Sequence, residues 1–349
     1  MIARRLPASV AALILQGIVR SAFAEDLPLF ASEDTLDVLF EFPLRTIVRE
    51  ADDRPVVDGR LSYADADGRT VSIDLTMTTR GKSRLEYCRF PPLSMNLKRD
   101  RTDGTLFTGQ NKLKIVSHCR SGPVFERYLL QEYGIYRALN VLTEQSFRVR
   151  RLNATYRDSE GRDKDAVSLA FFLESDNEVA DRLGFEKFDV SIVNPAQLDE
   201  AHASLVALFQ FMVANTDWSS IRGPEDEGCC HNGKVVVPPA SRDGWLVIPY
   251  DFDQSGVINT SYSSPADQLG IRSVRQRLYR GRCSHLDRLE ATRALFNERR
   301  AALETALLPE GVEDRFRASV LSYIDDFYAI INDDRKRERY LENACLGGD

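Results

Sequence analysis

The stretch from residue 205 to residue 261 contains, in order, the segments NTDWS (215–219), CHNGK (230–234) and IPYDFD (248–253). The apolar run LVALFQFMV at 205–213 directly precedes the first segment and predicts a buried helix. Because the apolar pattern stops at residue 213, we expect the helix to end there and Asp217 to lie on the loop that follows.

A β-hairpin is predicted between the second and third segments. Residues 234–237 and 245–250 are short apolar runs, and the Pro-Pro and Asp-Gly pairs between them favour a turn. Asn232 comes just before this hairpin and Asp251 follows it. We therefore expect both side chains at the same end of the hairpin.

The order of these polar groups suits phosphoryl transfer. In that reaction one carboxylate positions the attacking hydroxyl, while an amide and a second carboxylate hold a divalent cation against the phosphates. We expect Asp217 to align the hydroxyl as the catalytic residue. Asn232 and Asp251 are the expected ligands of Mg²⁺ or Mn²⁺, and Asp253 would assist the metal. The alternative is that these residues only cap helices and form turns.

These segments resemble the CotH-type kinase-like family of secreted atypical kinases, in which an N-x-D loop, a later Asn and a P-W/Y-D-x-D segment carry catalysis and metal binding. The sequence RGKSR at 80–84, followed by FPP at 90–92, is similar to the family's R-G-x-S-x segment and the F-P-K-K after it. The resemblance covers about residues 76–262. It departs from the family pattern at Pro91-Pro92 and at 222–228, where this chain carries an insertion.

The resemblance implies an α+β fold of the two-lobed protein-kinase-like type. An antiparallel β-rich N-terminal lobe would span residues 25–174, and a mainly helical C-terminal lobe residues 175–349. The resemblance also implies ATP as cofactor, together with Mg²⁺ or Mn²⁺. In such a fold Arg80 and Lys114 would meet the phosphates, and Glu132 would orient the lysine.

The first half of the chain has the alternating pattern of β-strands. Apolar and polar residues alternate at 36–42 and at 71–78, which predicts an antiparallel sheet with one solvated face. A β-sandwich binding module would begin with the same pattern. These strands alone therefore do not decide the function.

A lysine and a glutamate of this half are candidates for the nucleotide site. Residues 112–116 (KLKIV) predict a strand with both lysines on one face, and Lys114 is the first candidate for a phosphate contact, with Lys98 the second. A solvated strand face explains either lysine equally well. Residues 124–141 have helical spacing, and Glu132 lies in the middle of that helix.

The N-terminus has the pattern of a secretory signal peptide. Residues 1–24 combine two early arginines, an apolar core and the small-residue ending Ala22-Phe23-Ala24. Cleavage would remove three arginines and lower the formal net charge from −7 to about −10. This acidity disfavours nucleic acid as a partner. No other apolar run is long enough to span a membrane, so a periplasmic or secreted location is expected.

The cysteines predict disulfides in an oxidising compartment. The chain has six of them: Cys88, Cys119, Cys229, Cys230, Cys283 and Cys345. Six cysteines allow fifteen pairings, which the sequence leaves open. Cys88 and Cys119 fall in the same predicted lobe, and Cys229 or Cys230 is placed to reach Cys283. A metal site formed by Cys229, Cys230 and His231 is the competing, weaker interpretation, because adjacent cysteines do not easily share a tetrahedral ion.

Arginines are concentrated after the catalytic segments, at positions 272, 275, 277, 280 and 282. Such a cluster can hold a phosphorylated or acidic substrate. It can equally be a salt-bridged surface of an acidic protein. The sequence leaves both interpretations open.

The leading functional hypothesis is an exported, ATP- and metal-dependent phosphotransferase that acts on a protein or small-molecule hydroxyl. The alternative is a non-catalytic, pseudokinase-like envelope protein that binds a ligand or partner at the same site. A hydrolase is disfavoured, because the sequence has no G-x-S-x-G motif and its four histidines show no local catalytic signature.

Overall fold

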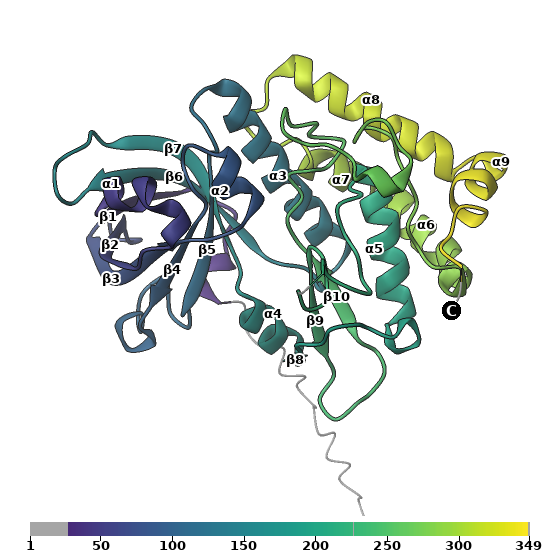
Figure 1. Cartoon of the computed structure of the whole chain (residues 1–349), viewed down its shortest axis with the longest axis horizontal. Helices are drawn as coiled ribbons and strands as arrows, with labels where there is room; N and C mark the ends of the chain where they lie inside the picture. The colour runs from purple at the N-terminus through teal and green to yellow at the C-terminus, as the bar shows by residue number, and fades with distance from the viewer. Residues whose placement is uncertain (1–26, 226, 348–349) are drawn as a thin grey trace, which may run out of the picture.

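Seven strands of the first half close into a β-barrel, drawn on the left of Figure 1. Their order around the barrel is β1-β2-β3-β4-β5-β7-β6. The strands are β1 (Leu36–Phe42), β2 (Val57–Ala64), β3 (Thr70–Thr79), β4 (Leu93–Leu97), β5 (Lys112–Ser117), β6 (Val149–Asp158) and β7 (Ala166–Leu173). The computed structural model describes residues 27–225 and 227–347, so the predicted signal peptide lies outside the described residues.

The predicted two-lobed protein-kinase-like fold, with an antiparallel β-rich N-terminal lobe, is wrong. The strands form a closed barrel, and β1 closes it by pairing in parallel with β6, from Leu36 opposite Leu152 to Phe42 opposite Asp158. The second half also has a sheet of its own, in the order β10-β9-β8. The alternating pattern shows which side chains face inward, but it does not identify the strand that a distant strand pairs with.

The inward faces of the barrel agree with the alternation in the sequence. In β1 the apolar side chains at 36, 38, 40 and 42 are all buried, and in β3 Ile73, Leu75 and Met77 are buried in the same way. The turn between β2 and β3 is fixed by Asp65, whose Oδ1 accepts hydrogen bonds from the backbone amides of Asp67 and Arg69. The barrel interior is therefore a filled apolar core.

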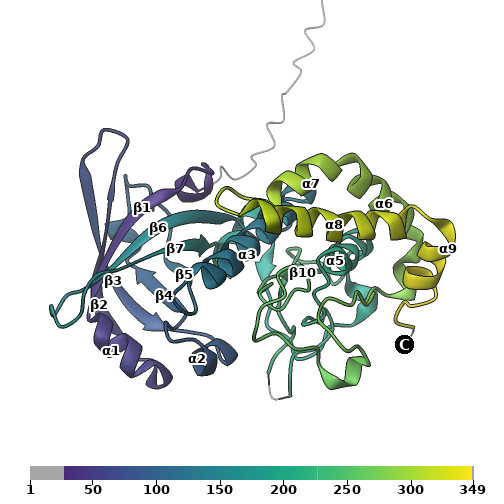
Figure 2. The same ribbon diagram turned by 90° about the horizontal axis from the view of Figure 1, so that it is seen from above.

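Helix α3 (Pro123–Leu142) runs between the barrel and the helices of the C-terminal part, α5 to α9 (residues 200–337), in both views (Figure 1 and Figure 2). Most of its residues from Tyr128 onward are buried, because it contacts both sides. The other helices are α1 (Leu44–Arg49), α2 (Ser83–Tyr87), α4 (Asp176–Leu183), α5 (Glu200–Val213), α6 (Leu289–Glu298), α7 (Arg300–Ala306), α8 (Asp314–Ile331) and α9 (Asp334–Arg337). Helix α5 lies at the centre of the helical half, where its apolar residues join one large core with α3 and α8.

The predicted hairpin is confirmed. Strand β9 (Gly233–Val237) pairs antiparallel with β10 (Leu246–Pro249), and β8 (Glu186–Lys187) adds a short third strand on the other edge of β9. The register places Gly233 opposite Pro249. The residues just before β9 and just after β10 therefore lie side by side.

Three disulfides join the six cysteines. The bond between Cys88 and Cys119 agrees with the pair expected within the first half. The expected bond from Cys229 or Cys230 to Cys283 is wrong, because Cys229 and Cys230 bond to each other and Cys283 bonds to Cys345. Within the described residues, no helix is long and apolar enough to cross a membrane. Disulfides of this kind are compatible with an exported protein.

Candidate functional site

Asp217 lies on the loop after α5, as the sequence predicts. Helix α5 ends at Val213, and Ala214 follows in the left-handed conformation with φ 51°. The side chain of Asn215 then accepts a hydrogen bond from the backbone amide of Asp217, at 3.0 Å. This turn directs the loop away from the helix axis and leaves the Asp217 side chain 39% exposed.

The carboxylate of Asp217 is held by two neighbouring side chains. Nε2 of His231 lies 2.7 Å from Oδ1, and Nδ2 of Asn232 donates to Oδ2 at 3.0 Å. The same amide also donates to the Asp217 backbone carbonyl, at 2.7 Å. The hydrogen bond with Asp217 raises the pKa of His231, although burial opposes this effect. Asp217 is thus fixed in position by the chain itself.

The end of the hairpin brings Asn232 next to Asp251. The amide of Tyr250 donates to the Asn232 carbonyl at 3.1 Å, and both Asn232 and Asp251 have left-handed backbones, with φ of 50° and 62°. Asn and Asp tolerate this conformation better than most residues. At Gly233 an added Cβ would lie 2.6 Å from Cγ1 of Val247, so a larger residue would push the strands apart. Asn232 and Asp251 therefore lie at the same end of the hairpin, as the sequence predicts.

Two buried carboxyl groups lie next to this hairpin end. Glu132 of α3 is 3% exposed and Asp253 is 7% exposed. Burial, together with the nearby Asp251 carboxylate, raises the pKa of Glu132 to about 8 and that of Asp253 to about 7, although Arg84 acts to lower both. The hydroxyl of Tyr262 donates to Asp253 at 3.1 Å. We call Glu132, Asp251 and Asp253 the acidic cluster, and the raised pKa values of Glu132 and Asp253 favour the protonated, neutral forms of these two acids.

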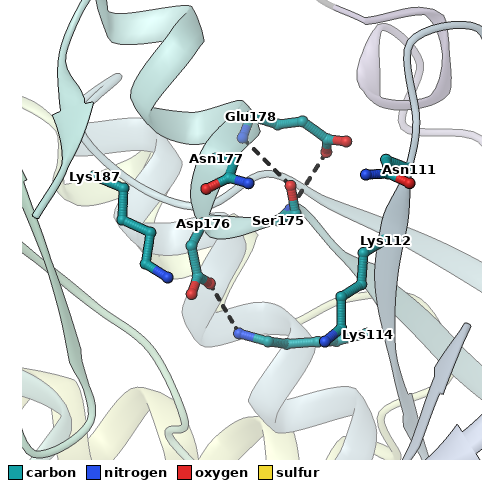
Figure 3. A pocket seen from close by; sticks show the side chains of 8 residues that line it. All are labelled: Asn111, Lys112, Lys114, Ser175, Asp176, Asn177, Glu178 and Lys187. Atoms are coloured by element: carbon teal, nitrogen blue, oxygen red, sulfur yellow. Dashed lines mark hydrogen bonds and ion pairs between the residues drawn. The ribbon is translucent and has the colours of Figure 1, made fainter. Parts of the chain in front are cut away.

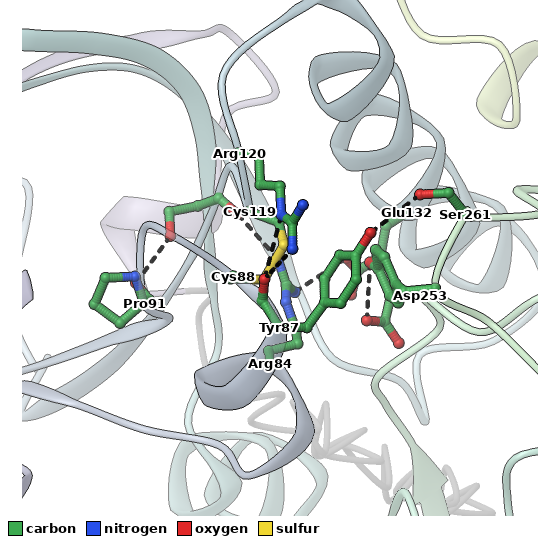
Figure 4. Close-up of a disulfide and its surroundings, with 11 residues drawn as sticks. Arg84, Tyr87, Cys88, Pro91, Cys119, Arg120, Glu132, Asp253 and Ser261 are labelled. Carbon is green, nitrogen blue, oxygen red and sulfur yellow. Dashed lines mark hydrogen bonds and ion pairs between the residues drawn. A yellow bond between two sulfur atoms is a disulfide. The ribbon is translucent and has the colours of Figure 1, made fainter. Parts of the chain in front are cut away.

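Two arginines of the RGKSR segment face the acidic cluster. Nη1 of Arg84 lies 3.7 Å from Oε2 of Glu132, as Figure 4 shows beside the Cys88–Cys119 disulfide. Arg80 donates from Nε to the carbonyl of Leu93 at 3.1 Å. Burial lowers the pKa of Arg80, while the neighbouring carboxylate of Asp251 acts to raise it. The sequence identified Arg80 as a site candidate but missed Arg84 in the same segment.

Lys114 does not pair with Glu132, so that expected contact is wrong. Its Nζ lies 3.0 Å from Oδ1 of Asp176, at the start of α4, and 4.9 Å from the ring centre of Tyr250. Lys234 reaches the other oxygen of Asp176 at 3.8 Å. Burial lowers the pKa of Lys114. Glu132, the α3 carboxylate expected to orient Lys114, forms an ion pair with Arg84 instead.

A polar cavity of about 280 Å³ lies on the Lys114 side (Figure 3). Its walls come from the start of β5 and the start of α4, and the lining residues are Asn111, Lys112, Lys114, Ser175, Asp176, Asn177, Glu178 and Lys187. Ser175 and Glu178 cap each other at the helix start, which fixes that wall. None of the acidic cluster lines this cavity. Tyr250 connects the two places, because it contacts Lys114 and directly precedes Asp251.

The residues proposed for a metal are all oxygen donors. Carboxylate and amide oxygens suit Mg²⁺ or Mn²⁺, and Mg²⁺ is usually bound by one or two carboxylates together with substrate phosphates. In the described part of the chain no three His, Cys, Asp or Glu side chains gather closely enough to hold a metal ion by themselves. The raised pKa of Asp253 reflects repulsion between neighbouring acids as well as burial, and a cation would relieve that repulsion. The donor set fits a cation that arrives with a phosphate ligand.

The structure adds three residues that the site prediction lacked. His231 and Arg84 each lie within a quoted segment, so their position in the sequence was a usable signal. Asp176 had no such signal, because its contact with Lys114 joins segments far apart in the chain. Lys98, the second lysine candidate, is exposed at the end of β4.

Comparisons with protein-family models, with curated proteins and with solved structures find no match for this chain. The resemblance to the CotH-type family therefore stays a prediction that rests on the quoted segments.

Proposed function

We propose that the chain is an exported, metal-dependent phosphotransferase that moves the terminal phosphoryl group of ATP to a hydroxyl group of a protein or small molecule. The observation that supports it best is the hairpin end, where Nδ2 of Asn232 donates to the Asp217 carboxylate and Asp251 follows β10 at the same end. This is the set of groups that hydroxyl activation and phosphate binding require together.

Asp217 is the group that receives the proton. Its carboxylate is partly exposed and already oriented by His231 and Asn232, so an incoming hydroxyl meets a fixed acceptor. The hydroxyl oxygen forms a bond to the terminal phosphorus while the bond from that phosphorus to the bridging oxygen breaks. The proton passes to Asp217, and the nucleoside diphosphate leaves with the bridging oxygen.

The cationic groups bind the phosphates. Arg80 and Lys114 flank Asp251 and Tyr250, and the polar cavity beside Lys114 offers a place for the rest of the nucleotide. A bound Mg²⁺ or Mn²⁺ would neutralise phosphate charge, and Asp251, Asp253 and the amide oxygen of Asn232 would hold it.

The direct test combines a melting curve with a transfer assay on the purified exported protein. ATP with Mn²⁺ or Mg²⁺ should raise the melting temperature by mass action, and radiolabelled phosphate should appear on the protein itself or on a generic protein acceptor. Stabilisation with no transfer in the presence of either metal would contradict the enzyme and support the alternative below. If ATP neither stabilises the protein nor donates phosphate to it, nucleotide binding itself is contradicted.

The second candidate function is a non-catalytic envelope protein that binds a ligand or partner at the same site. The observation that favours it is the ion pair between Lys114 and Asp176, which replaces the expected contact with Glu132. A lysine held in this way is less available to phosphates. The transfer assay separates the two candidates.

A further inference from the structure

Two of the arginines that follow the site, Arg277 and Arg280, are partly buried and donate to backbone carbonyls. Arg277 donates from Nη2 to the backbone carbonyls of Met212, at 3.3 Å, and Tyr323, at 2.5 Å. Arg280 donates to carbonyls of the Asp217 loop. These two side chains therefore connect backbone segments, and neither of the interpretations left open by the sequence describes them.

Arg280 donates hydrogen bonds to the loop on both sides of Asp217. Its Nη1 lies 2.6 Å from the carbonyl oxygen of Thr216 and 2.6 Å from that of Trp218. The guanidinium also lies over the indole of Trp218, 5.9 Å from the ring centre. The two carbonyls belong to the residues just before and just after Asp217, so their directions fix the backbone that carries its side chain.

Arg280 is itself held in place by the C-terminal end of the chain. The amide of Cys283 donates to the Leu346 carbonyl at 3.1 Å, and the amide of Leu346 donates to the Gly281 carbonyl at 2.8 Å. The disulfide between Cys283 and Cys345 closes the same contact. The backbone next to Arg280 is therefore held in place by the C-terminal end of the chain.

We propose that Arg280 is a positioning residue for Asp217. It sets the backbone of the loop, while His231 and Asn232 orient the carboxylate at its tip. This inference rests on the proposed function, because Asp217 must act on a substrate for its position to matter. Arg280 contacts neither the acidic cluster nor the cavity beside Lys114 through any hydrogen bond or ion pair among the described residues.

The test compares Arg280→Ala with Arg277→Ala, a matched loss of an arginine that also donates to backbone carbonyls but not beside Asp217. Arg280→Ala should lower the kcat of phosphoryl transfer about 10- to 100-fold, since small misplacements of a reacting group cost this much. Its KM for ATP should stay within about twofold of the parent, because the loop does not hold the nucleotide. Arg277→Ala should lower the melting temperature and leave kcat unchanged below it.

A second variant and a second measurement keep the inference testable. Arg280→Lys retains the charge and a hydrogen-bond donor and should recover part of the lost kcat. It also allows the test to be made if Arg280→Ala folds poorly. Amide hydrogen exchange in residues 214–219 should speed up in the Arg280 variants and not in Arg277→Ala. Equal losses of kcat in the two alanine variants, or unchanged exchange in the loop, would overturn the assignment. If the parent transfers no phosphate, the proposed function fails, and the exchange measurement still decides whether Arg280 holds the loop.

Discussion

The two sides of the candidate site differ in what folding alone has satisfied. On one side, Asp217 receives hydrogen bonds from His231 and Asn232 and needs no further partner. On the other side, Arg84 lies 3.7 Å from Glu132 and Tyr262 donates to Asp253, yet the two buried acids near Asp251 still have pKa values raised to about 8 and about 7. Buried acids of like charge are stable only when protonated or when a cation is close. We infer that the fold alone builds the first side and that a bound cation completes the second.

The largest effect is expected on the side that the fold builds. Asp217→Ala should reduce phosphoryl transfer by about two to four orders of magnitude, the usual contribution of a positioned base. The affinity for ATP and metal should stay close to that of the parent, because Asp217 contacts neither in the proposed arrangement. Radiolabelled transfer and nucleotide titration on the same purified variant measure both quantities. If Asp217 only caps the loop, its loss should instead lower the free energy of unfolding by about 0.5 to 2 kcal/mol. The melting temperature would then fall with no selective loss of transfer.

The next largest effect is expected on the side completed by a ligand. Asp251→Asn keeps the shape of the residue and the left-handed backbone, but it removes one of the charges that would hold the cation. The stabilisation by ATP with Mn²⁺, about 2.7 kcal/mol at a hundredfold excess over Kd, should disappear while the unliganded melting temperature changes little. An unchanged response to ATP and Mn²⁺ would show that the cation is not held here.

Local patterns predicted the parts of this site that lie close together in the sequence. The helix before Asp217 and the hairpin from Asn232 to Asp251 follow from apolar runs and turn residues, and both are present. The hairpin in turn positions Asn232, whose side-chain amide donates hydrogen bonds to Asp217. The relative positions of these residues are predictable because short connections between the helix and the hairpin allow few chain conformations.

Contacts between distant segments were not predictable in the same way. The closure of the barrel by β1 and β6, the partner of Lys114 and the partner of Glu132 all depend on how far-apart segments meet. Alternation assigns a strand residue to a face but not to a neighbour. The kinase-like fold was implied by the resemblance of the quoted segments, and the barrel closure overturned it, although the strands expected at 36–42, 71–78 and 112–116 are present.

A further effect should appear in the pH dependence of folding. The pKa of Glu132 is about 8 in the folded chain and near 4.5 in an unfolded one, so between these values the folded state holds a proton that the unfolded state releases. The free energy of unfolding should therefore fall as pH rises through this window, by at most about 1.4 kcal/mol per pH unit for this one group. Glu132→Gln should flatten the fall, as measured by urea unfolding from pH 5 to pH 8.

The matched control for that measurement is Glu126→Gln, which changes an exposed glutamate on the same helix. It should leave the slope of the parent unchanged. ATP with Mn²⁺ should also flatten the slope in the parent, because a cation near the cluster favours the ionised acids. A steep slope that persists in Glu132→Gln would assign the pH dependence to another group.

The smallest effect is expected at His231, and it separates the two sides most clearly. The pKa of His231 is raised above 6.5, chiefly by its hydrogen bond with Asp217, so its contribution to stability is fully present below pH 6.5 and is lost as pH rises through the higher folded value. The side chains of His231 and Asp217 are 35% and 39% exposed, so solvent screens the pair and limits its contribution to stability to less than about 1 kcal/mol. His231→Ala should therefore destabilise the chain slightly at pH 5.5 and not by this route at pH 9.

A double-mutant cycle with Asp217→Asn isolates this contribution from that of the acidic cluster, whose stability also falls as pH rises. In the Asp217→Asn background, the loss of His231 should have a smaller pH-dependent effect, because the carboxylate that contributes most to the raised pKa of His231 is gone, while Asp251 and Glu227 remain. ATP with Mn²⁺ should flatten the slope that comes from Glu132 and leave the His231 increment at pH 5.5 in place. If the increment disappears with the cation instead, Asp217 and the acidic cluster respond as one unit, and the division between a side built by the fold and a side completed by a ligand does not hold.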